Sequence, residues 1–363
     1  MSRLIRPLPE GPLDIVGDVH GELDALRRLL ARLGCDPDRG TAERPVVFVG
    51  DLVDRGPDSP GVLRVVRRLV EAGVGHAVAG NHELNLLHRD RKEGNGWFFG
   101  HNDGYAWAEG GVTHRRPFPS VALRSDDERR EISDFLATLP VALERPDLRV
   151  VHACWDDAVL DELPREGDLV ELVDAAEARV VEGLQRTGLL ALAERERRRY
   201  ADLRDIDMKP DRPLLAVQAV ALAEQIANPF RVLTSGPEEP IRTAEPYYVG
   251  GKWRFVRRSP WWERYRDPAA VVVGHYWRRR QVRAPQEVSW GDGPFAWAGP
   301  AGRVFCVDYS VGRRFLERWR HEATGAAGEP AWQGGLAALR WPERVLVFDD
   351  LDEPVPTTGF GAA

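Results

Sequence analysis

Three short apolar runs in the first third of the chain each lead directly into a polar loop. The runs cover residues 13–18, 45–51 and 75–81, and the segments between them, residues 23–34 and 59–73, have helical periodicity and end in glycine. This order predicts a β-α-β-α-β unit, in which right-handed crossovers make the strands parallel. Ligands of such sheets bind beyond the carboxyl ends of the strands, so we expect a site where the three polar loops meet.

The three loops carry motifs that are rich in metal-binding side chains: GDVHG at residues 17–21, GDLVDRG at 50–56 and GNHE at 80–83. The side chains that can act chemically are Asp18, His20, Asp51, Asp54, Arg55, Asn81 and His82. Carboxylate oxygens, amide oxygens and imidazole nitrogens bind divalent metal ions, and a guanidinium group matches two phosphoryl oxygens. Together the motifs predict the ligand set of a two-metal phosphoester hydrolase.

Two metal ions about 3.5–4 Å apart need one shared carboxylate and further ligands on each side. Asp51 is the expected bridge, because it ends the central strand. Asp18 and His20 would complete the first metal site, and Asn81 would join the second through its amide oxygen. The second metal site still needs nitrogen ligands from elsewhere in the chain.

Two histidines that follow later apolar runs are candidates for those ligands. The later runs predict strands at residues 148–153, 269–275, 303–310 and 344–350. His152 lies at the end of the first of these runs and His275 at the end of the second. We therefore expect both histidines at the second metal site.

In this order, the three motifs, a strand-end histidine and a strand-end Gly-His resemble the calcineurin-like metallophosphoesterases. Within them, the chain is most similar to the phosphoprotein phosphatase family and to its relatives, the symmetrical diadenosine tetraphosphatases. The resemblance covers residues 17–310 and implies an α/β sandwich of two β-sheets flanked by helices. It also implies a first metal held by Asp18, His20 and Asp51, and a second held by Asp51, Asn81, His152 and His275.

Phosphoester cleavage also needs a proton for the leaving oxygen and a clamp for the phosphoryl oxygens. His82 lies beside the ligand Asn81 and is the expected general acid. Asp54 could bind His82, fix its tautomer and keep it protonated. Arg55 suits a bidentate contact with a phosphoryl group, because its planar guanidinium matches two oxygens.

The resemblance implies a second phosphate-binding arginine ahead of the last metal ligand. Arg231 and Arg242 are both candidates, and no motif distinguishes them. Glu83 is expected to support the helix start and the hydrogen bonds around the ligands rather than to act chemically. The tetraphosphatases tend to read GNHD where this chain reads GNHE, and they do not always keep Asp54, so both features favour the protein phosphatase side.

The stretch between His152 and His275 is mostly helical in its pattern. We expect a helical insertion, roughly residues 156–227, within a single domain that spans residues 1–363. The insertion either covers the active site or only adds core. The last residues, 354–363, are expected to form a frayed tail.

A further unusual segment, residues 252–283, surrounds His275 with cations and aromatic rings. Its cations are Lys252, Arg254, Arg257, Arg258, Arg264, Arg266, Arg278, Arg279, Arg280 and Arg283, and its aromatic residues are Trp253, Trp261, Trp262, Tyr265, Tyr276 and Trp277. Two interpretations stay open. The segment recognises a polyanionic or nucleotide substrate through its charge and an aromatic face, or it is a packed aromatic corner with solvated arginines.

The composition limits other classes of protein. The chain has 363 residues and a formal net charge of −7, which argues against a general nucleic-acid or membrane binder. Its three cysteines, Cys35, Cys154 and Cys306, have no paired spacing, so a disulfide framework is not expected. The sequence shows no signal-peptide pattern and no apolar stretch of about 20 residues. We therefore expect a cytoplasmic protein.

The expected function is hydrolysis of phosphomonoesters, including phosphoserine or phosphothreonine in proteins, by a hydroxide that bridges two metal ions. The alternative is a symmetrical dinucleoside tetraphosphate hydrolase, and a remote third is a catalytically silent phosphate-binding module. Mn²⁺ is the expected ion, and Fe or Zn also suits mixed nitrogen and oxygen ligands. The expected partner is the phosphorylated substrate, with neither a membrane nor a nucleic acid involved.

Overall fold

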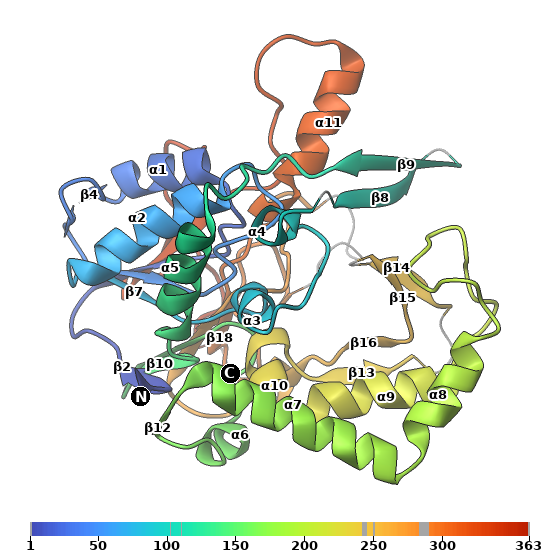
Figure 1. Cartoon of the computed structure of the whole chain (residues 1–363). Coiled ribbons are helices and arrows are strands. Elements are labelled where there is room, and N and C mark those ends of the chain that lie inside the picture. The colour runs from blue at the N-terminus through green and yellow to red at the C-terminus, as the bar shows by residue number, and fades with distance from the viewer. Residues whose placement is uncertain are drawn as a thin grey trace.

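A computed structural model describes residues 2–101, 103–109, 111–241, 245–249, 251–282 and 290–361. Two β-sheets form the centre of the molecule and helices lie outside them (Figure 1). The strand order is β21-β20-β19-β3-β6-β7 in the first sheet and β18-β17-β11-β10-β2 in the second. The predicted α/β architecture of two sheets flanked by helices is confirmed.

The predicted β-α-β-α-β unit forms one half of the first sheet. Its parallel strands are β3 (Leu13–Val16), β6 (Val46–Phe48) and β7 (Gly75–Ala77), and its crossover helices are α1 (Leu23–Arg32) and α2 (Ser59–Glu71). The strands are shorter than the apolar runs of the sequence. The last residues of each run instead belong to the loops that carry the motifs.

Later parts of the chain supply most of the other strands. The first sheet is completed by antiparallel β19 (Ala337–Trp341), β20 (Val345–Phe348) and β21 (Val355–Pro356). The second sheet contains β2 (Ile5–Pro7), β10 (Ala142–Arg145), β11 (Leu148–Val151), β17 (Ala270–Val273) and β18 (Val304–Cys306). Strands β11, β17 and β18 are parallel, so their carboxyl ends share one edge.

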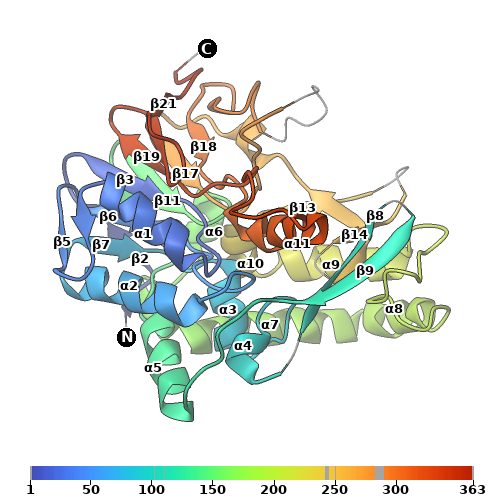
Figure 2. The same ribbon diagram turned by 90° about the horizontal axis from the view of Figure 1, so that it is seen from above.

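Side chains from both sheets meet in one apolar core. Ile15 and Val47 of the first sheet and Val150, Val272 and Phe305 of the second are fully buried in the same cluster. Successive side chains of a strand point to opposite faces, so the neighbours of Val47 pack in a separate cluster with α1 and α2. The two sheets therefore form a sandwich whose first sheet is covered by these helices, as Figure 2 shows from above.

Helices dominate the chain between β11 and β17. They are α6 (Asp157–Asp161), α7 (Leu169–Arg186), α8 (Leu189–Arg197), α9 (Leu215–Ile226) and α10 (Pro229–Ser235). The short strands β13 (Glu238–Pro240), β14 (Tyr247–Val249), β15 (Lys252–Arg254) and β16 (Val256–Arg258) follow. Helices α7 to α9 lie along one side of the molecule (Figure 1), and their apolar cluster includes Leu184, Val217 and Phe255. The segment expected to be an insertion thus adds core of its own.

A hairpin and a late helix stand together on another side of the molecule (Figures 1 and 2). The elements are β8 (Gly104–Glu109), β9 (Val112–Pro117) and α11 (Arg314–Thr324). Tyr105 of the hairpin packs against Phe315 of α11 with ring centroids 5.1 Å apart, and Trp107 stacks on Trp319 at 5.6 Å. These rings join two parts of the chain that are far apart in sequence.

The remaining described elements are short, except for the helix α5, which has 12 residues. They are β1 (Ser2–Arg3), β4 (Cys35–Asp36), β5 (Thr41–Ala42), β12 (Glu166–Gly167), α3 (Asn81–Leu87), α4 (Gly96–Phe99), α5 (Asp126–Ala137) and the 3-10 turns Trp261–Arg264 and Val311–Arg313. Among the helices of the described ranges, none has the length and apolar character needed to cross a membrane.

The end of the chain differs from the prediction of a frayed tail. Strand β21 pairs with β20, and Phe360 packs against Trp297 and Trp341 with ring centroids 4.7 and 5.8 Å apart. The prediction was wrong because one aromatic ring and one short strand anchor a segment whose composition otherwise suggests a loose end.

Candidate metal and phosphate site

The predicted ligands lie just beyond the carboxyl ends of five strands. Strands β3 and β6 lead into the loops with His20 and Asp51, and β7 leads into α3, which begins at Asn81. His152 directly follows β11, and His275 lies two residues after β17. Because the strands of each unit are parallel, their ends share an edge, and the sandwich brings the two edges together.

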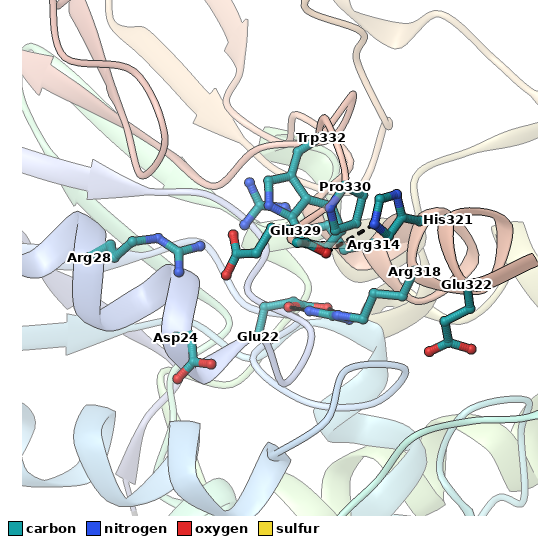
Figure 3. Close-up of a pocket in the computed structure, with 11 residues that line it drawn as sticks. Glu22, Asp24, Arg28, Arg314, Arg318, His321, Glu322, Glu329, Pro330 and Trp332 are labelled. Atoms are coloured by element: carbon teal, nitrogen blue, oxygen red, sulfur yellow. Dashed lines mark hydrogen bonds and ion pairs between the residues drawn. The ribbon is translucent and has the colours of Figure 1, made fainter. Parts of the chain in front are cut away.

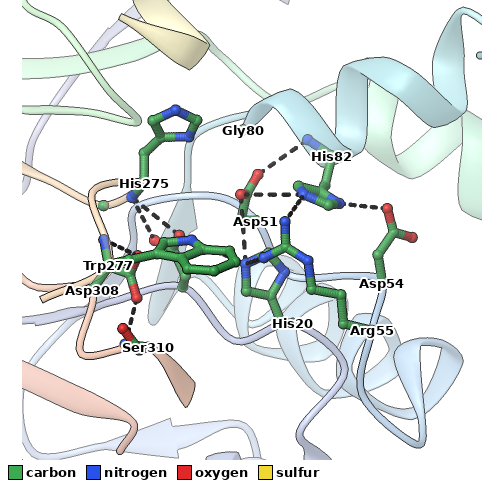
Figure 4. Close-up of polar contacts among 12 residues, drawn as sticks. His20, Asp51, Asp54, Arg55, Gly80, His82, His275, Trp277, Asp308 and Ser310 are labelled. Atoms are coloured by element: carbon green, nitrogen blue, oxygen red, sulfur yellow. Dashed lines mark hydrogen bonds and ion pairs between the residues drawn. The ribbon is translucent and has the colours of Figure 1, made fainter. Parts of the chain in front are cut away.

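The Asp51 carboxylate lies at the centre of this group (Figure 4). Its Oδ1 is 3.3 Å from Nε2 of His152, and its Oδ2 is 3.7 Å from Nε2 of His20 and 3.8 Å from Nε2 of His82. Two sets of possible ligand atoms each lie within 4.8 Å of one another: His20, Asp51 and His82, and Asp51, His152 and His275. Asp51 belongs to both sets, as a bridging carboxylate must.

Asp18 joins the same group through a backbone contact. Its carboxylate oxygens accept hydrogen bonds from the N–H of His275 at 3.1 and 3.2 Å, and Oδ2 is 3.9 Å from Nε2 of His20. A Cβ on Gly274 would lie 1.9 Å from Oδ1 of Asp18, so this approach requires glycine. Burial, with the nearby Asp308 carboxylate, raises the pKa of Asp18 well above its usual value. A cation beside Asp18 would offset both effects.

Two buried polar atoms of the group have no hydrogen-bond partner within the described residues: Oδ1 of Asn81 and Nε2 of His152. Such atoms are costly unless something other than the protein binds them. The Nδ1 atoms of His20 and His152 lie 3.0 and 2.7 Å from backbone carbonyl oxygens and donate to them. Their Nε2 atoms therefore carry the lone pair and lie near Asp51, which is the orientation of metal-binding histidines.

The electrostatics of the group favour positive charge next to Asp51. Burial acts to lower the pKa of His152, yet the Asp51 carboxylate outweighs it and raises that pKa to about 10. Burial and neighbouring arginines hold the pKa of His20 and of His275 well below the usual value, so both imidazoles are neutral, as metal binding requires. A proton on Nε2 of His152, or a metal ion between this atom and the Asp51 carboxylate, removes the repulsion between the nitrogen lone pair and the carboxylate oxygen. The donor set therefore fits divalent metal ions.

His82 and Asp54 form a buried pair beside the ligand group. Nδ1 of His82 is 2.5 Å from Oδ2 of Asp54, whose other oxygen accepts a hydrogen bond from Nε1 of Trp97 at 2.8 Å. Burial raises the pKa of Asp54. With its Nδ1 held in this way, the imidazole presents Nε2 to the site, which is the arrangement needed for proton transfer to a bound ligand.

The guanidinium of Arg55 contacts the imidazole rings of both His20 and His82 (Figure 4). Its Nη1 is 2.8 Å from Nε2 of His20, and its Nη2 is 3.0 Å from Nε2 of His82. Its Cζ lies 4.8 Å from the centre of the Trp277 ring. The two terminal nitrogens thus face into the site, as a bidentate phosphate contact requires.

Backbone strain is concentrated in these loops. Five residues of the group have a positive φ: His20 (47°), Asp51 (48°), Asp54 (74°), Arg55 (69°) and His275 (68°). This conformation is uncommon for residues with a side chain and costs free energy. Its occurrence at five predicted site residues indicates that the loops are shaped to hold these side chains rather than for stability alone.

The candidates for a second phosphate-binding arginine lie elsewhere. Nη2 of Arg231, on α10, is 2.6 Å from the Glu177 carboxylate of α7, so this side chain stabilises the helical segment, and none of its contacts among the described residues reaches the ligand group. Arg242 lies outside the described residues. Arg258 does approach the group, because its Nη1 donates to the carbonyl oxygen of His275 at 3.0 Å.

Much of the arginine-rich and aromatic segment around His275 is packed. Its buried rings are those of Trp261, Tyr265 and Tyr276. Arg254 pairs with Glu238, and Arg257 pairs with Glu239 at 2.6 Å. These contacts agree with a packed corner. Trp277 differs, because it is only partly buried and lies beside the phosphate-binding candidate Arg55. Arg283 lies outside the described residues.

The structure adds residues that the motifs did not single out. The buried Asp308 accepts hydrogen bonds from the N–H groups of Trp277 at 2.9 Å and Ser310 at 2.7 Å. Gly312 lies against the ligand ring of His20, where a Cβ would be 2.3 Å from Cδ2. The available signal was the VDYS run directly after β18, which repeats the pattern of the other strand ends: an apolar run followed by an acidic residue.

Comparisons with known proteins match part of this chain to one family model and to several relatives. Residues 11–170 match the family model described as calcineurin-like phosphoesterase. The asymmetrical bis(5'-nucleosyl)-tetraphosphatase of Oceanobacillus iheyensis is 46% identical over 81 residues, which are 21% of this chain and 32% of that protein. The symmetrical bis(5'-nucleosyl)-tetraphosphatase of Aeromonas salmonicida is 34% identical over 157 residues, 42% of this chain and 49% of that protein. The chain thus spans about a third and about half of the length of these relatives.

Among solved structures, a cold-active protein-tyrosine phosphatase of a psychrophilic Shewanella species is 16% identical, with a TM-score of 0.42 and coverage of 95% of this chain and 81% of that chain. The family match contains all three motifs and His152, whereas His275 lies beyond it. Residues 11–170 are thus similar to the calcineurin-like phosphoesterases.

Proposed function

We propose that the protein is a metal-dependent hydrolase of phosphoesters, with phosphomonoesters, including phosphoserine and phosphothreonine, as first candidates. The observation that carries the proposal is the position of Asp51, whose two oxygens face three imidazoles and which belongs to both sets of possible metal ligands. Asp18 and Asn81 complete the ligand candidates. Two divalent ions at such a site, with Mn²⁺ as the expected ion, supply Lewis acidity that activates water and neutralises phosphoryl oxygens.

The residues of the chain have separate roles in this proposal. Arg55 binds two phosphoryl oxygens and orients the phosphorus for attack, exchanging its present imidazole partners for the substrate. His82 donates a proton from Nε2 to the leaving oxygen as the bond from phosphorus breaks. Asp54 is a positioning residue, because it touches Nδ1 of His82 and not the substrate. The oxygen of water ends on phosphate, and the leaving group departs as an alcohol.

A dinucleoside tetraphosphate is the second candidate substrate. The curated names of two relatives, both bis(5'-nucleosyl)-tetraphosphatases, favour it. The chemistry at phosphorus is the same for both substrate classes, since either reaction needs an activated water and a phosphoryl clamp. The two candidates differ in the leaving group, which is an alcohol in one case and a nucleotide phosphate in the other.

A panel assay with Mn²⁺ tests the proposal. Nitrophenyl phosphate, a phosphoserine peptide and diadenosine tetraphosphate are compared by kcat/KM, with Asp51→Asn as the control for contaminating phosphatases. Turnover of the first two that is lost in Asp51→Asn supports the first candidate. A preference of about a hundredfold or more for the dinucleotide selects the second. Inactivity on all three with metal bound would contradict hydrolysis and leave a phosphate-binding module.

A further inference from the structure

Arg313 and Arg314 are neighbours in the chain but differ in their contacts. The Arg314 guanidinium is 1% exposed and donates to both carboxylate oxygens of Asp349, at 2.8 and 3.0 Å. Arg313 is only partly buried, and its guanidinium has neither a hydrogen bond nor an ion pair within the described ranges. Its ring contact is with Trp277, whose centre lies 5.8 Å from Cζ. In the part of the chain that the structure describes, Arg313 is therefore a cation beside Trp277 without a carboxylate partner.

The guanidinium of Arg55, the phosphate-binding candidate, lies over the same Trp277 ring. The Cζ of Arg55 lies 4.8 Å from the centre of the Trp277 ring, and Figure 4 shows the ring beside this guanidinium. The N–H of Trp277 donates to Asp308 at 2.9 Å, which holds the backbone of the tryptophan. The two guanidinium groups place two positive charges beside one ring. A ligand with two anionic groups can pair with both of them.

Anchored residues on both sides hold Arg313 in place. Before it, Gly312 lies against the His20 ring, so close that a Cβ would be 2.3 Å from Cδ2. After it, α11 is tied down by Arg318, whose Nη1 donates to Glu22 at 2.7 Å (Figure 3). Glu22 directly follows the GDVHG motif. The position of Arg313 relative to the metal ligands is thus set before a substrate binds, and preorganisation of this kind reduces the free-energy cost of binding.

A neighbouring cavity of about 250 Å³ does not compete for the same ligand (Figure 3). It is lined by Arg28, Arg314 and Arg318, and each of these arginines already binds a carboxylate. Arg28 and Arg314 bind Asp349, and Arg318 binds Glu22. The cavity therefore lies among paired charges that attach α11 to the sandwich. Arg313 differs from these three arginines, since its guanidinium forms no ion pair among the described residues.

On the basis of the proposed function, we infer that Arg313 and Trp277 form a second anion-binding position beside Arg55. This position favours the second candidate substrate, a phosphoanhydride, over the phosphomonoester that Arg55 alone would bind. The phosphoryl group under attack lies at Arg55, and the next phosphate lies at Arg313. The oxygen of water bonds to the attacked phosphorus while the bond from that phosphorus to the bridging oxygen breaks. The electron pair stays on this oxygen, and the leaving group departs as the phosphate held by Arg313.

Calorimetry with two phosphonates tests the second position without relying on turnover. Methylphosphonate offers one anionic group and methylenediphosphonate offers two, and each is titrated into protein loaded with Mn²⁺. Wild-type protein is expected to bind the diphosphonate at least about tenfold more tightly. Arg313→Gln is expected to remove this preference while changing the Kd of methylphosphonate by less than about threefold. Arg313→Lys should keep part of the preference, because it keeps the charge but not the fork.

Arg320→Gln is the matched control, because Arg320 is an exposed arginine of α11, the helix that begins directly after Arg313, and it pairs with Glu109 at 3.1 Å. It should bind both phosphonates as the wild type does. Trp277→Leu should lose the preference as Arg313→Gln does, because Arg313 then lacks the ring beside it. An equal loss for both phosphonates in Arg313→Gln, or no loss for either, would overturn the inference.

The two proposals fail in different ways. If the wild type hydrolysed none of the panel substrates, the proposed function would fall, while the calorimetric preference and its loss in Arg313→Gln would still support the second position. If the wild type turned over nitrophenyl phosphate but bound the diphosphonate no better than methylphosphonate, the proposed function would stand and the second position would be refuted.

Discussion

The carboxylate of Glu83 accepts a hydrogen bond from the backbone N–H of Asp51 at 2.8 Å and joins two of the motif loops. It also accepts from the N–H of Leu52 at 2.9 Å and from that of Gly80 at 2.8 Å. Three backbone donors thus converge on one fully buried side chain. The strained backbone of Asp51 is held by these bonds, which agrees with the supporting role expected for Glu83 from the sequence.

Glu83→Gln should lower the free energy of unfolding by about 1–3 kcal/mol, because the amide NH₂ cannot accept and leaves at least one buried N–H unpaired. Urea unfolding of the variant and of the wild type in the same buffer measures the difference. Glu71→Gln is the control, since Glu71 is 62% exposed and forms a surface pair with Arg67. It should change stability by less than about 0.5 kcal/mol. Equal stability of Glu83→Gln and wild type would refute the role of Glu83.

The pair of His82 and Asp54 predicts a dependence on the leaving group. His82→Ala should keep its metals but lose about 10²- to 10⁴-fold in kcat on phosphoesters with a basic leaving oxygen, which needs a proton as it departs. The loss should be smaller for nitrophenyl phosphate. A series of aryl phosphates measures this, with the exposed His114→Ala as control. The same slope against leaving-group pKa in His82→Ala and wild type would remove His82 from the mechanism.

The close packing of Gly312 against His20 predicts that a larger residue at position 312 weakens metal binding. A Cβ at this position would meet Cδ2 of His20 at 2.3 Å, so Gly312→Ala must displace the imidazole. We expect the Kd for the metal that His20 binds to rise by at least about tenfold in a calorimetric titration with Mn²⁺. Gly183→Ala in α7 is the control, because its Cβ would have no neighbour within 4 Å. It should keep the wild-type affinity and gain about 0.5–1 kcal/mol of stability. Unchanged affinity in Gly312→Ala would refute the contact.

Asp14 predicts a pH dependence of stability away from the metal ligands. It lies near the start of β3, is fully buried and has its ion pair with Nε of Arg340 at 3.2 Å. Burial raises its pKa to about 6. The folded protein therefore holds this proton more tightly than the unfolded chain does. The contribution of Asp14 to the free energy of unfolding falls as pH rises from about 4 to about 6, and it is level above that range.

Asp14→Asn should remove this slope. Relative to the wild type, the variant should gain up to about 3 kcal/mol in the free energy of unfolding between pH 4 and 6, which is the most that a shift of this size allows. Urea unfolding at a series of pH values measures the difference. Asp352→Asn serves as control, because the Asp352 side chain is 96% exposed. Parallel profiles for wild type and Asp14→Asn would contradict the raised pKa.

The first sheet and the ligand group could be predicted because local signals specify them. An apolar run that ends in Asp51 and another that ends before Asn81 define both the strands and the ends where ligands collect. His275 was predictable for the same reason, although it comes from the other sheet. Because the strands pair in parallel, the residues that follow successive apolar runs come together at one edge of the sheet.

Other features depend on packing between distant segments and leave no local signal. Arg313 lies beside Trp277, and its neighbour Arg314 binds Asp349; nothing in the sequence near Arg314 indicates that pair. The hairpin β8–β9 has little burial along its strands and is held by rings of α11. Arg231 was predicted from its position in the chain, but its guanidinium forms an ion pair with Glu177.

The central claim is that Asp51 joins two metal ions. Elemental analysis of protein loaded with Mn²⁺ and freed of unbound metal tests it most directly, with circular dichroism to establish that Asp51→Asn is folded. Wild-type protein should hold two ions per chain, and Asp51→Asn should lose both, because the bridging carboxylate belongs to both ligand sets. Folded Asp51→Asn that retains two ions per chain would contradict the account.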